Sequence, residues 1–187
     1  MFVEGKRVYL RLIEKSDIKY PYLNWLNDLG VVRYLESRFC PQTAESISRY
    51  IDDNPYLMAI CLKDTITGTV GYETNKPHQH ICNINLRNIN WIHRFAEVGL
   101  LIGEKDEWGK GYGSEAISLM ANYAFEILGL HKLTAGCYSK NVGAIKAFEK
   151  AGFQIEGTLR RHYWFEGRYT DAVILGKVKE AKNCRKN

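Results

Sequence analysis

A glycine-rich turn at residues 108–116 is the segment best suited to bind an anion. It reads WGKGYGSEA and places Gly109, Gly111 and Gly113 within five positions. Glycine adopts backbone angles that other residues resist, and it lets a ligand approach the main chain closely. The next residues have helical periodicity, so the free N–H groups and partial positive charge of a helix start would face a ligand across the turn. The sequence therefore predicts an anion site here.

Two common phosphate-binding patterns do not fit this turn. A nucleoside triphosphate loop needs a glycine, four residues and then Gly-Lys-Ser/Thr, whereas five residues separate Gly103 from Gly109 and Lys110 is followed by Gly111. A dinucleotide fingerprint needs its third glycine three positions after the second, but Gly113 follows Gly111 by two. The next predicted strand also ends without an acidic residue to hold a ribose. A glycine-rich helix entry with no ligand stays open as the alternative.

The spacing Trp108-x-x-Gly111-x-Gly113 resembles the Gln/Arg-x-x-Gly-x-Gly/Ala loop that binds the pyrophosphate of acetyl-CoA in the Gcn5-related N-acetyltransferases (GNAT). Trp108 departs from that pattern, but in the family main-chain N–H groups hold the pyrophosphate and the first side chain is peripheral. A second segment, NVGAIKAFEKAGF at residues 141–153, resembles the family's second cofactor segment. Two matches in the family's order imply a GNAT-like N-acetyltransferase domain.

The resemblance implies acetyl-CoA as cosubstrate and a set of residues around it. Asn141 would hold the pantetheine arm, and capping of the following helix is a compatible second role. Ala144 and Phe148 would line the groove of the arm, and Lys150 would lie near the adenosine phosphates. The expected cofactor-binding residues are Leu100, Leu101, Ile102, Trp108, Gly109, Lys110, Gly111, Tyr112, Gly113, Ser114, Asn141, Ala144, Phe148 and Lys150.

Acetyl transfer from a thioester needs a neutral amine and a stabilised oxyanion. In the resembling families an acid at the position of Glu97 often acts as base, frequently through water. Pairing with Arg87 or Arg94 is the alternative role for Glu97. The family also separates the strand around residues 99–102 from the strand at residues 132–138, which implies a backbone N–H near Leu101 as oxyanion donor. For Gly99 a strand bulge without chemistry stays open.

The proton donor for the departing thiolate is missing from its usual place. Many relatives have Tyr where this chain has Phe148, and some have Ser where it has Ala144. Tyr138, Ser139 or water are the substitutes that the sequence offers. A thiol has a pKa of about 8.5, so a donor helps the reaction without being obligatory.

Alternating and helical patterns predict the elements that position these residues. The chain shifts from helical periodicity to short apolar runs after Tyr56 and returns to helices from Ser114. The expected strands are Arg7 to Ile13, YLMAICLK, GTVGYE, ICNINL, AEVGLLIG and Lys132 to Tyr138; the expected helices run from a cap at Ser16 or Asp17 to Asn27, from near Thr43, from Ser114 to Leu128, and from Val142 to Lys150, the last ended by Gly152 with Phe153 folding back.

The order of these elements predicts an α/β fold with a mixed sheet. The early strands should form an antiparallel meander, while the strand–helix–strand unit at residues 96–138 is a crossover that makes its two strands parallel. The resemblance adds that this parallel pair is splayed and that helices flank the sheet. A length of 187 residues with 45% hydrophobic residues suits one domain over 1–187, with a mobile tail from about residue 178.

Composition limits the other partners. A net charge of +5 suits a phosphorylated cofactor but falls short of a dedicated nucleic-acid surface. The sequence shows no membrane span or signal peptide, which favours a cytoplasmic protein. The five cysteines have no paired metal-ligand spacing, and His78 and His80 are interpreted as solvated, so no metal is expected.

The acceptor is the least determined part. The segments LNWLNDLGVVRYL and FQIEGTLRRHYWFEGRYTDAVILG resemble the branch of ribosomal-protein N-terminal and amino-sugar acetyltransferases. This implies a small-molecule amine, such as a nucleotide-linked amino sugar, or a peptide N-terminus as acceptor. A non-catalytic acyl-CoA sensor is the third reading, because the usual donor is absent. A monomer and a homodimer both stay open.

Overall fold

The computed structural model describes residues 2–63 and 79–180. Within this part, eight strands form one sheet in the order β1-β2-β3-β4-β5-β6-β8-β7. The strands are β1 (Val3–Glu4), β2 (Val8–Leu12), β3 (Leu57–Leu62), β4 (His80–Asn90), β5 (Phe95–Ile102), β6 (Lys132–Tyr138), β7 (Gln154–Phe165) and β8 (Arg168–Val178). Only β5 and β6 pair in parallel among them. The predicted mixed, mostly antiparallel fold with one parallel pair is confirmed.

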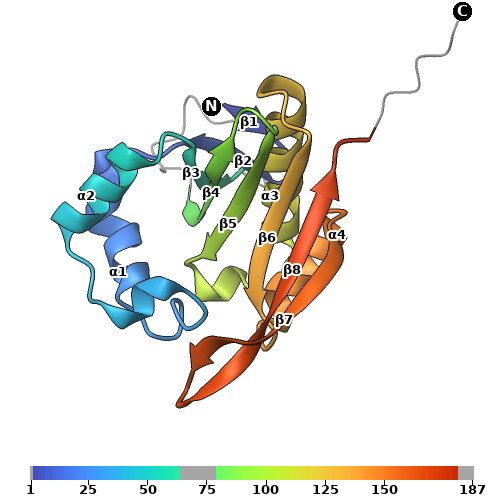
Figure 1. Ribbon diagram of the computed structural model, residues 1–187. Coiled ribbons are helices and arrows are strands. Elements are labelled where there is room, and N and C mark those ends of the chain that lie inside the picture. Colours follow the sequence, from blue (N-terminus) through green and yellow to red (C-terminus); the bar gives the residue numbers. More distant parts are fainter. Residues whose placement is uncertain (1, 64–78, 181–187) are drawn as a thin grey trace, which may run out of the picture.

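Helices cover both faces of the sheet (Figure 1). The α-helices are α1 (Leu23–Leu26), α2 (Ala44–Asp53), α3 (Tyr112–Asn122) and α4 (Val142–Lys150). The main core joins α3 and α4 to one face, and its fully buried side chains include Leu10, Ile84 and Met120. A second, smaller core joins α1 and α2 to the opposite face. The two cores leave the sheet as a rigid middle layer.

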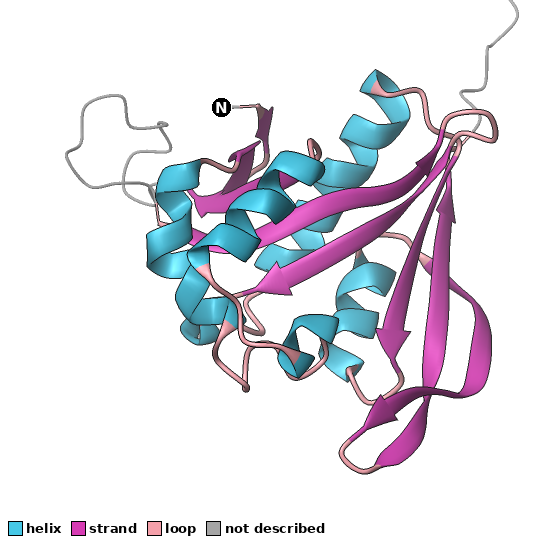
Figure 2. Cartoon of the chain, turned by 60° about the vertical axis from the view of Figure 1, so that its left-hand side comes forward, coloured by secondary structure: helices cyan, strands magenta, loops and turns pink. Residues whose placement is uncertain are grey.

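The parallel pair is short and then opens. Its paired residues run from Phe95 opposite Lys132 to Glu97 opposite Thr134, and no pair follows. From that end β5 and β6 diverge, as Figure 2 shows. The β4–β5 register continues through Gly99 and shifts only between Arg87 and Asn90, so a bulge at Gly99 was a wrong alternative.

The first predicted helix is irregular. A 3-10 turn at Lys15–Asp17 and a π turn at Ile18–Tyr22, which contains Pro21, precede α1. Neither Ser16 nor Asp17 caps it as predicted, because the Asp17 carboxylate instead accepts from the Glu14 backbone N–H and from Arg11. Proline cannot donate the helical hydrogen bond, which accounts for the widened turn.

The other predicted elements hold with small shifts. Thr43 caps α2 by accepting from the Ser46 backbone N–H. The third helix begins at Tyr112, earlier than predicted, and its last turn at Tyr123–Ile127 widens to a π turn. Gly152 has a φ of 86°, and the Phe153 backbone N–H bonds the Phe148 carbonyl, so the predicted end of α4 is confirmed.

Some expectations lie outside the described residues, and one element was not expected. GTVGYE, His78 and the last residues of the predicted tail fall outside them. The β7–β8 hairpin, which follows α4, was not predicted as an element. Among the residues that are described, no helix is long and apolar enough to cross a membrane.

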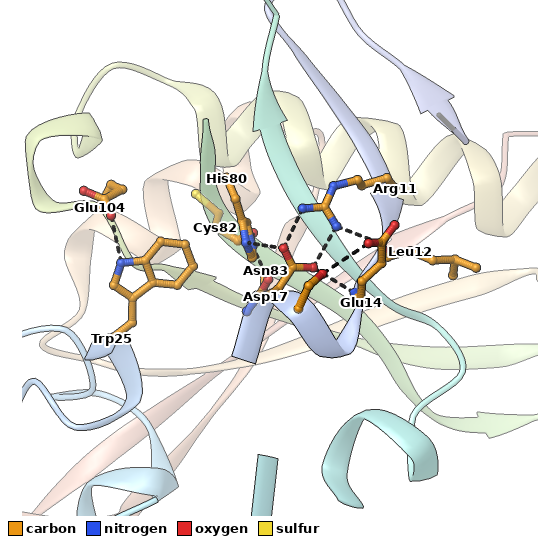
Figure 3. A network of polar contacts seen from close by, with 10 residues as sticks. Arg11, Leu12, Glu14, Asp17, Trp25, His80, Cys82, Asn83 and Glu104 are labelled. Atoms are coloured by element: carbon orange, nitrogen blue, oxygen red, sulfur yellow. Dashed lines mark hydrogen bonds and ion pairs between the residues drawn. The ribbon is translucent and has the colours of Figure 1, made fainter. Parts of the chain in front are cut away.

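A buried polar network ties β2 and β4 to the α1 layer, and Figure 3 shows its side chains pointing toward one another. Arg11 makes two 2.7 Å hydrogen bonds to the Asp17 carboxylate. The His80 ring lies beside them, with Nδ1 3.6 Å from Asp17 Oδ1 and Nε2 donating to Asn83 Oδ1 at 2.7 Å. The interpretation of His80 as solvated is therefore wrong, because β4 carries it into the interior.

Candidate functional site

A cavity of about 670 Å³ lies between the end of β5 and α4, the helix that follows β6. Its walls come from the end of β5, the start of α3, α4 and residues 30–35. Every predicted cofactor residue lines it except Lys110 and Phe148. The lining residues that were not predicted are Gly30, Val31, Arg33, Tyr34, Leu35, Lys105, Glu107, Gly143, Lys146 and Ala147.

The N-terminus of α3 faces this cavity with its backbone. Gly111 is the N-cap residue with a φ of 87°, a left-handed conformation that favours glycine, and no described side chain caps the helix. Residues 111–114 line the cavity, so the N–H groups of the first turn and the positive end of the helix dipole lie at its wall. Gly113 packs against β5, because a Cβ there would lie 2.9 Å from Ile102 Cδ1. This arrangement can bind an anion without using any side-chain charge.

Arg7 holds the turn in place from the start of β2. Its Nη1 donates to the Lys110 carbonyl oxygen at 2.9 Å, and its guanidinium lies 4.8 Å from the centre of the Tyr112 ring. Its Nε and backbone N–H both bond the Glu115 carboxylate. Burial alone would raise the pKa of Glu115, but these hydrogen bonds lower it. Sequence reasoning missed Arg7, because no local pattern connects it to a turn a hundred residues away.

The remaining side chains of the turn make local contacts. The Trp108 indole donates to the Ile102 carbonyl oxygen at 3.0 Å, so this departure from the family pattern fastens the turn to β5. Ser114 Oγ donates to the Gly111 carbonyl at 2.9 Å. Lys110 pairs with Glu107 at 3.0 Å and lies outside the lining.

The start of α4 forms the opposite wall. Asn141 Oδ1 accepts from the Ala144 backbone N–H at 3.2 Å, so the capping role is present while Asn141 also lines the cavity. Ala144 and Lys150 line it further along the helix. Phe148 does not line it, because it is buried in the main core with its ring centre 5.1 Å from that of Phe153.

Glu97 lies beside the cavity and not in its lining. Its carboxylate accepts from Arg87 at 2.5 Å and from Asn88 Nδ2 at 3.0 Å. Pairing with Arg87 is thus observed, and pairing with Arg94 is not among the described contacts. Glu97 is the last β5 residue paired with β6, which puts it at the base of the gap between these strands.

Tyr138 also lies outside the lining, at the end of β6. Its hydroxyl donates to Glu36 Oε1 at 2.7 Å and accepts from Arg38 Nη1 at 2.9 Å. Burial, followed by the hydrogen bond to Glu36, raises the pKa of Tyr138. The Ser139 and Thr170 hydroxyls form a hydrogen bond of 3.1 Å with each other. Both suggested substitutes for the missing donor therefore have partners already.

A strap at residues 33–38 closes the far end of the cavity against the β7–β8 hairpin. Arg33 pairs with Glu166 at 2.6 Å, the Tyr34 and Phe165 rings stack at 5.2 Å, and Arg38 Nη2 donates to the Trp164 carbonyl at 2.7 Å. Sequence reasoning missed this strap, and its only signal was the resemblance of the segment LNWLNDLGVVRYL.

The described side chains include no group of three or more His, Cys, Asp or Glu residues placed to hold a metal ion. The cavity instead combines backbone donors at one end with apolar walls such as Leu100, Ala144 and Ala147. Such a site suits an elongated ligand with an anionic group and a neutral arm.

Known proteins with similar sequences and folds are acetyltransferases. The family model described as "Acetyltransferase (GNAT) domain" matches residues 7–154. Spermidine N(1)-acetyltransferase of Escherichia coli K12 is 27% identical over 174 residues, which cover 90% of this chain and 84% of the relative. The uncharacterised N-acetyltransferase YoaA of Bacillus subtilis is 29% identical over 177 residues, covering 95% and 96%.

Solved structures agree on the fold. The spermidine N-acetyltransferase of Vibrio cholerae, determined with CoA and spermine, superposes with a TM-score of 0.76 at 24% identity, covering 93% of this chain and 96% of the other. A GNAT-family acetyltransferase from Bacillus anthracis has the same TM-score of 0.76 at 20% identity, covering 95% and 98%.

The relatives named here do not support the ribosomal-protein and amino-sugar branch that the sequence suggested. The superfamily itself is supported by a match that extends over most of the chain. Together with the fold and the cavity between β5 and α4, this match shows that the chain belongs to the GNAT family of acetyltransferases and is an acyltransferase.

Proposed function

We propose that this protein transfers an acetyl group from acetyl-CoA to a small primary amine. The uncapped N-terminus of α3 in the cavity wall is the observation that carries this proposal. The pyrophosphate binds the backbone N–H groups of residues 112–114, and Lys150 lies near the adenosine phosphates. The pantetheine arm runs between β5 and α4 past Asn141 and Ala144. The thioester then lies at the gap between β5 and β6.

Glu97 serves as the base in this proposal. Glu97 is the last β5 residue that pairs with β6, so its carboxylate, held by Arg87 and Asn88, lies at the base of the gap, where it takes the proton of the incoming ammonium through a water molecule. The neutral amine nitrogen attacks the thioester carbonyl, and the oxyanion is stabilised by the Leu101 backbone N–H.

An aliphatic polyamine is the first acceptor to test. The names of the relatives favour it, and the Glu36 carboxylate at the strap offers an acceptor for an ammonium group. The contacts of the strap with Glu166, Phe165 and Trp164 argue against an extended peptide, which needs an open groove.

A thiol-release assay tests the proposal. The purified protein is incubated with acetyl-CoA and, separately, spermidine, amino-sugar nucleotides and N-terminal peptides. Release of CoA that depends on spermidine, with acetylspermidine identified by mass spectrometry, is the expected result. CoA binding without turnover of any amine would instead favour an acyl-CoA sensor, and turnover of another acceptor alone would correct the substrate.

A further inference from the structure

The predicted residues leave no hydroxyl for protonating the CoA thiolate. Phe148 occupies the position of the family's usual donor and has no proton to give, since it is a buried phenylalanine of the main core. The Tyr138 hydroxyl directs its proton to Glu36. A donor must therefore come from elsewhere or be water.

Tyr163, on the β7 strand, reaches across β8 to the gap between β5 and β6. A Cβ placed on Gly136 of β6 would lie 3.2 Å from the Tyr163 hydroxyl oxygen, so the hydroxyl rests directly over this glycine. The last β6 residue that pairs with β5 is Thr134, opposite Glu97. Gly136 follows it on the same face of β6. The hydroxyl thus lies where the two strands have begun to part.

The Tyr163 ring is held by two neighbouring rings, while its hydroxyl makes no hydrogen bond to the described residues. Tyr163 stacks on Tyr138 with ring centres 4.2 Å apart and meets the edge of His162 at 4.9 Å. Within residues 2–63 and 79–180 its hydroxyl has no hydrogen-bond partner, in contrast to that of Tyr138. Burial, and then the charges of Glu36 and Glu97, raise the pKa of Tyr163. The phenol therefore keeps its proton near neutral pH.

We propose that Tyr163 is the proton donor to the departing CoA thiolate, in place of the tyrosine that the family usually carries at position 148. This proposal rests on the proposed acetyl transfer. The amine nitrogen forms a bond to the acetyl carbon, the C–S bond breaks, and its electron pair leaves on sulfur. The Tyr163 hydroxyl gives its proton to that sulfur. The acceptor nitrogen loses a proton as the amide forms, and this proton restores the Tyr163 phenol.

The variant Tyr163→Phe tests this role because it keeps the stacked ring and removes only the hydroxyl. We expect kcat with the active acceptor to fall by about 10- to 100-fold. The loss should be partial, because a thiolate can still leave, more slowly, without a proton donor. CoA affinity and the KM of the acceptor should stay within about twofold of wild type. Tyr169→Phe is the matched control, since it removes the same atom from an exposed tyrosine of β8 and should leave turnover unchanged.

Two further variants separate proton donation from a structural role. Gly136→Ala should also lower kcat with unchanged CoA affinity, because the added methyl displaces the hydroxyl while the strand backbone tolerates alanine. Replacing Tyr163 by a fluorinated tyrosine, whose phenol is more acidic, should move the loss of kcat at high pH to lower pH. A packing role would leave that pH profile unmoved.

The outcomes distinguish this proposal from the proposed function. Unchanged kcat in Tyr163→Phe, or a raised acceptor KM with normal kcat, would overturn the role of Tyr163 and leave the acetyltransferase intact. A wild-type protein that binds CoA but turns over no amine would contradict the proposed function, and the proton step with it.

Discussion

The two ends of the cavity are built in different ways. At the proposed cofactor end, the walls are formed by one continuous turn and the first residues of α4, so Gly111, Gly113 and Asn141 can be recognised as local sequence patterns. Beside the proposed acceptor end, the strap contacts β6 and the β7–β8 hairpin, which are far from it in sequence. A shared ligand can therefore be inferred from a motif, whereas the choice of acceptor depends on long-range packing.

The largest expected effect concerns how the α1 layer is held on the sheet. Asp17→Asn should lower the free energy of unfolding by about 3 kcal/mol at pH 7, because it removes the buried carboxylate that pairs with the partly buried Arg11 charge. CoA affinity should be nearly unchanged, since the network lies outside the cavity. Urea titrations measure the first quantity, and calorimetry measures the second.

The pH dependence of that variant has a defined sign. Burial works to raise the pKa of Asp17, but the hydrogen bonds from Arg11 and from the Glu14 backbone, with the His80 ring nearby, outweigh it, and the pKa lies well below its usual value. The stabilisation is present above the unfolded pKa of about 3.9 and is lost as pH falls toward the folded value. The difference in free energy of unfolding between wild type and Asp17→Asn should thus be largest at pH 7 and should decrease below about pH 4. Asp52→Asn, which breaks the exposed pair with Lys15, should cost under about 1 kcal/mol.

Glu97→Gln separates chemistry from cofactor binding. The amide keeps the shape of the side chain but cannot accept the ammonium proton, so kcat should fall by about 100-fold. CoA affinity should not change, because Glu97 does not line the cavity. Steady-state kinetics with the active amine provides the measurement, and an unchanged kcat would reassign the base.

Asn141→Ala has the smallest expected effect and separates the two roles of this residue, capping of α4 and contact with the pantetheine arm. Loss of the α4 cap should cost about 1 kcal/mol of stability, and loss of the contact to the pantetheine arm should weaken CoA binding by about fivefold. Thr43→Ala removes the equivalent cap of α2 and should cost similar stability with no change in CoA affinity. Equal CoA affinities in the two variants would assign Asn141 to capping alone.

Much of the fold followed from the sequence because its signals are local. Short apolar runs between polar breaks predicted β3 to β5, and β6 was predicted as the strand after the third helix. Helical periodicity predicted α3 and α4, and Gly152 marked the end of α4. The predicted cap of the first helix failed because the Asp17 carboxylate bonds Arg11, a partner that no helix pattern reveals, while Pro21 accounts for the widened turn that follows. His80 was misplaced for the same kind of reason, since its burial depends on the pairing of β4 in the sheet.

The site was predictable to the same extent. The glycine turn and Asn141 line one cavity, because short motifs fix backbone geometry, and their contacts with CoA stay a prediction. Arg7, the strap and Tyr163 were not predicted, since each lies against residues that are far away in the sequence. Phe148 lay in the core because its side of α4 packs against Phe153.

The central claim is that the backbone at the start of α3 binds the pyrophosphate of CoA. Calorimetric titration of CoA into the wild type, Gly113→Val and the control Gly157→Val tests it most directly, because a side chain at Gly113 must push into Ile102 while Gly157 has open space around it. The account predicts saturable binding to the wild type and the control, and at least about 100-fold weaker binding to a folded Gly113→Val, equivalent to losing one to two charge-assisted hydrogen bonds. Equal affinity in all three proteins, or no binding to the wild type, would contradict it.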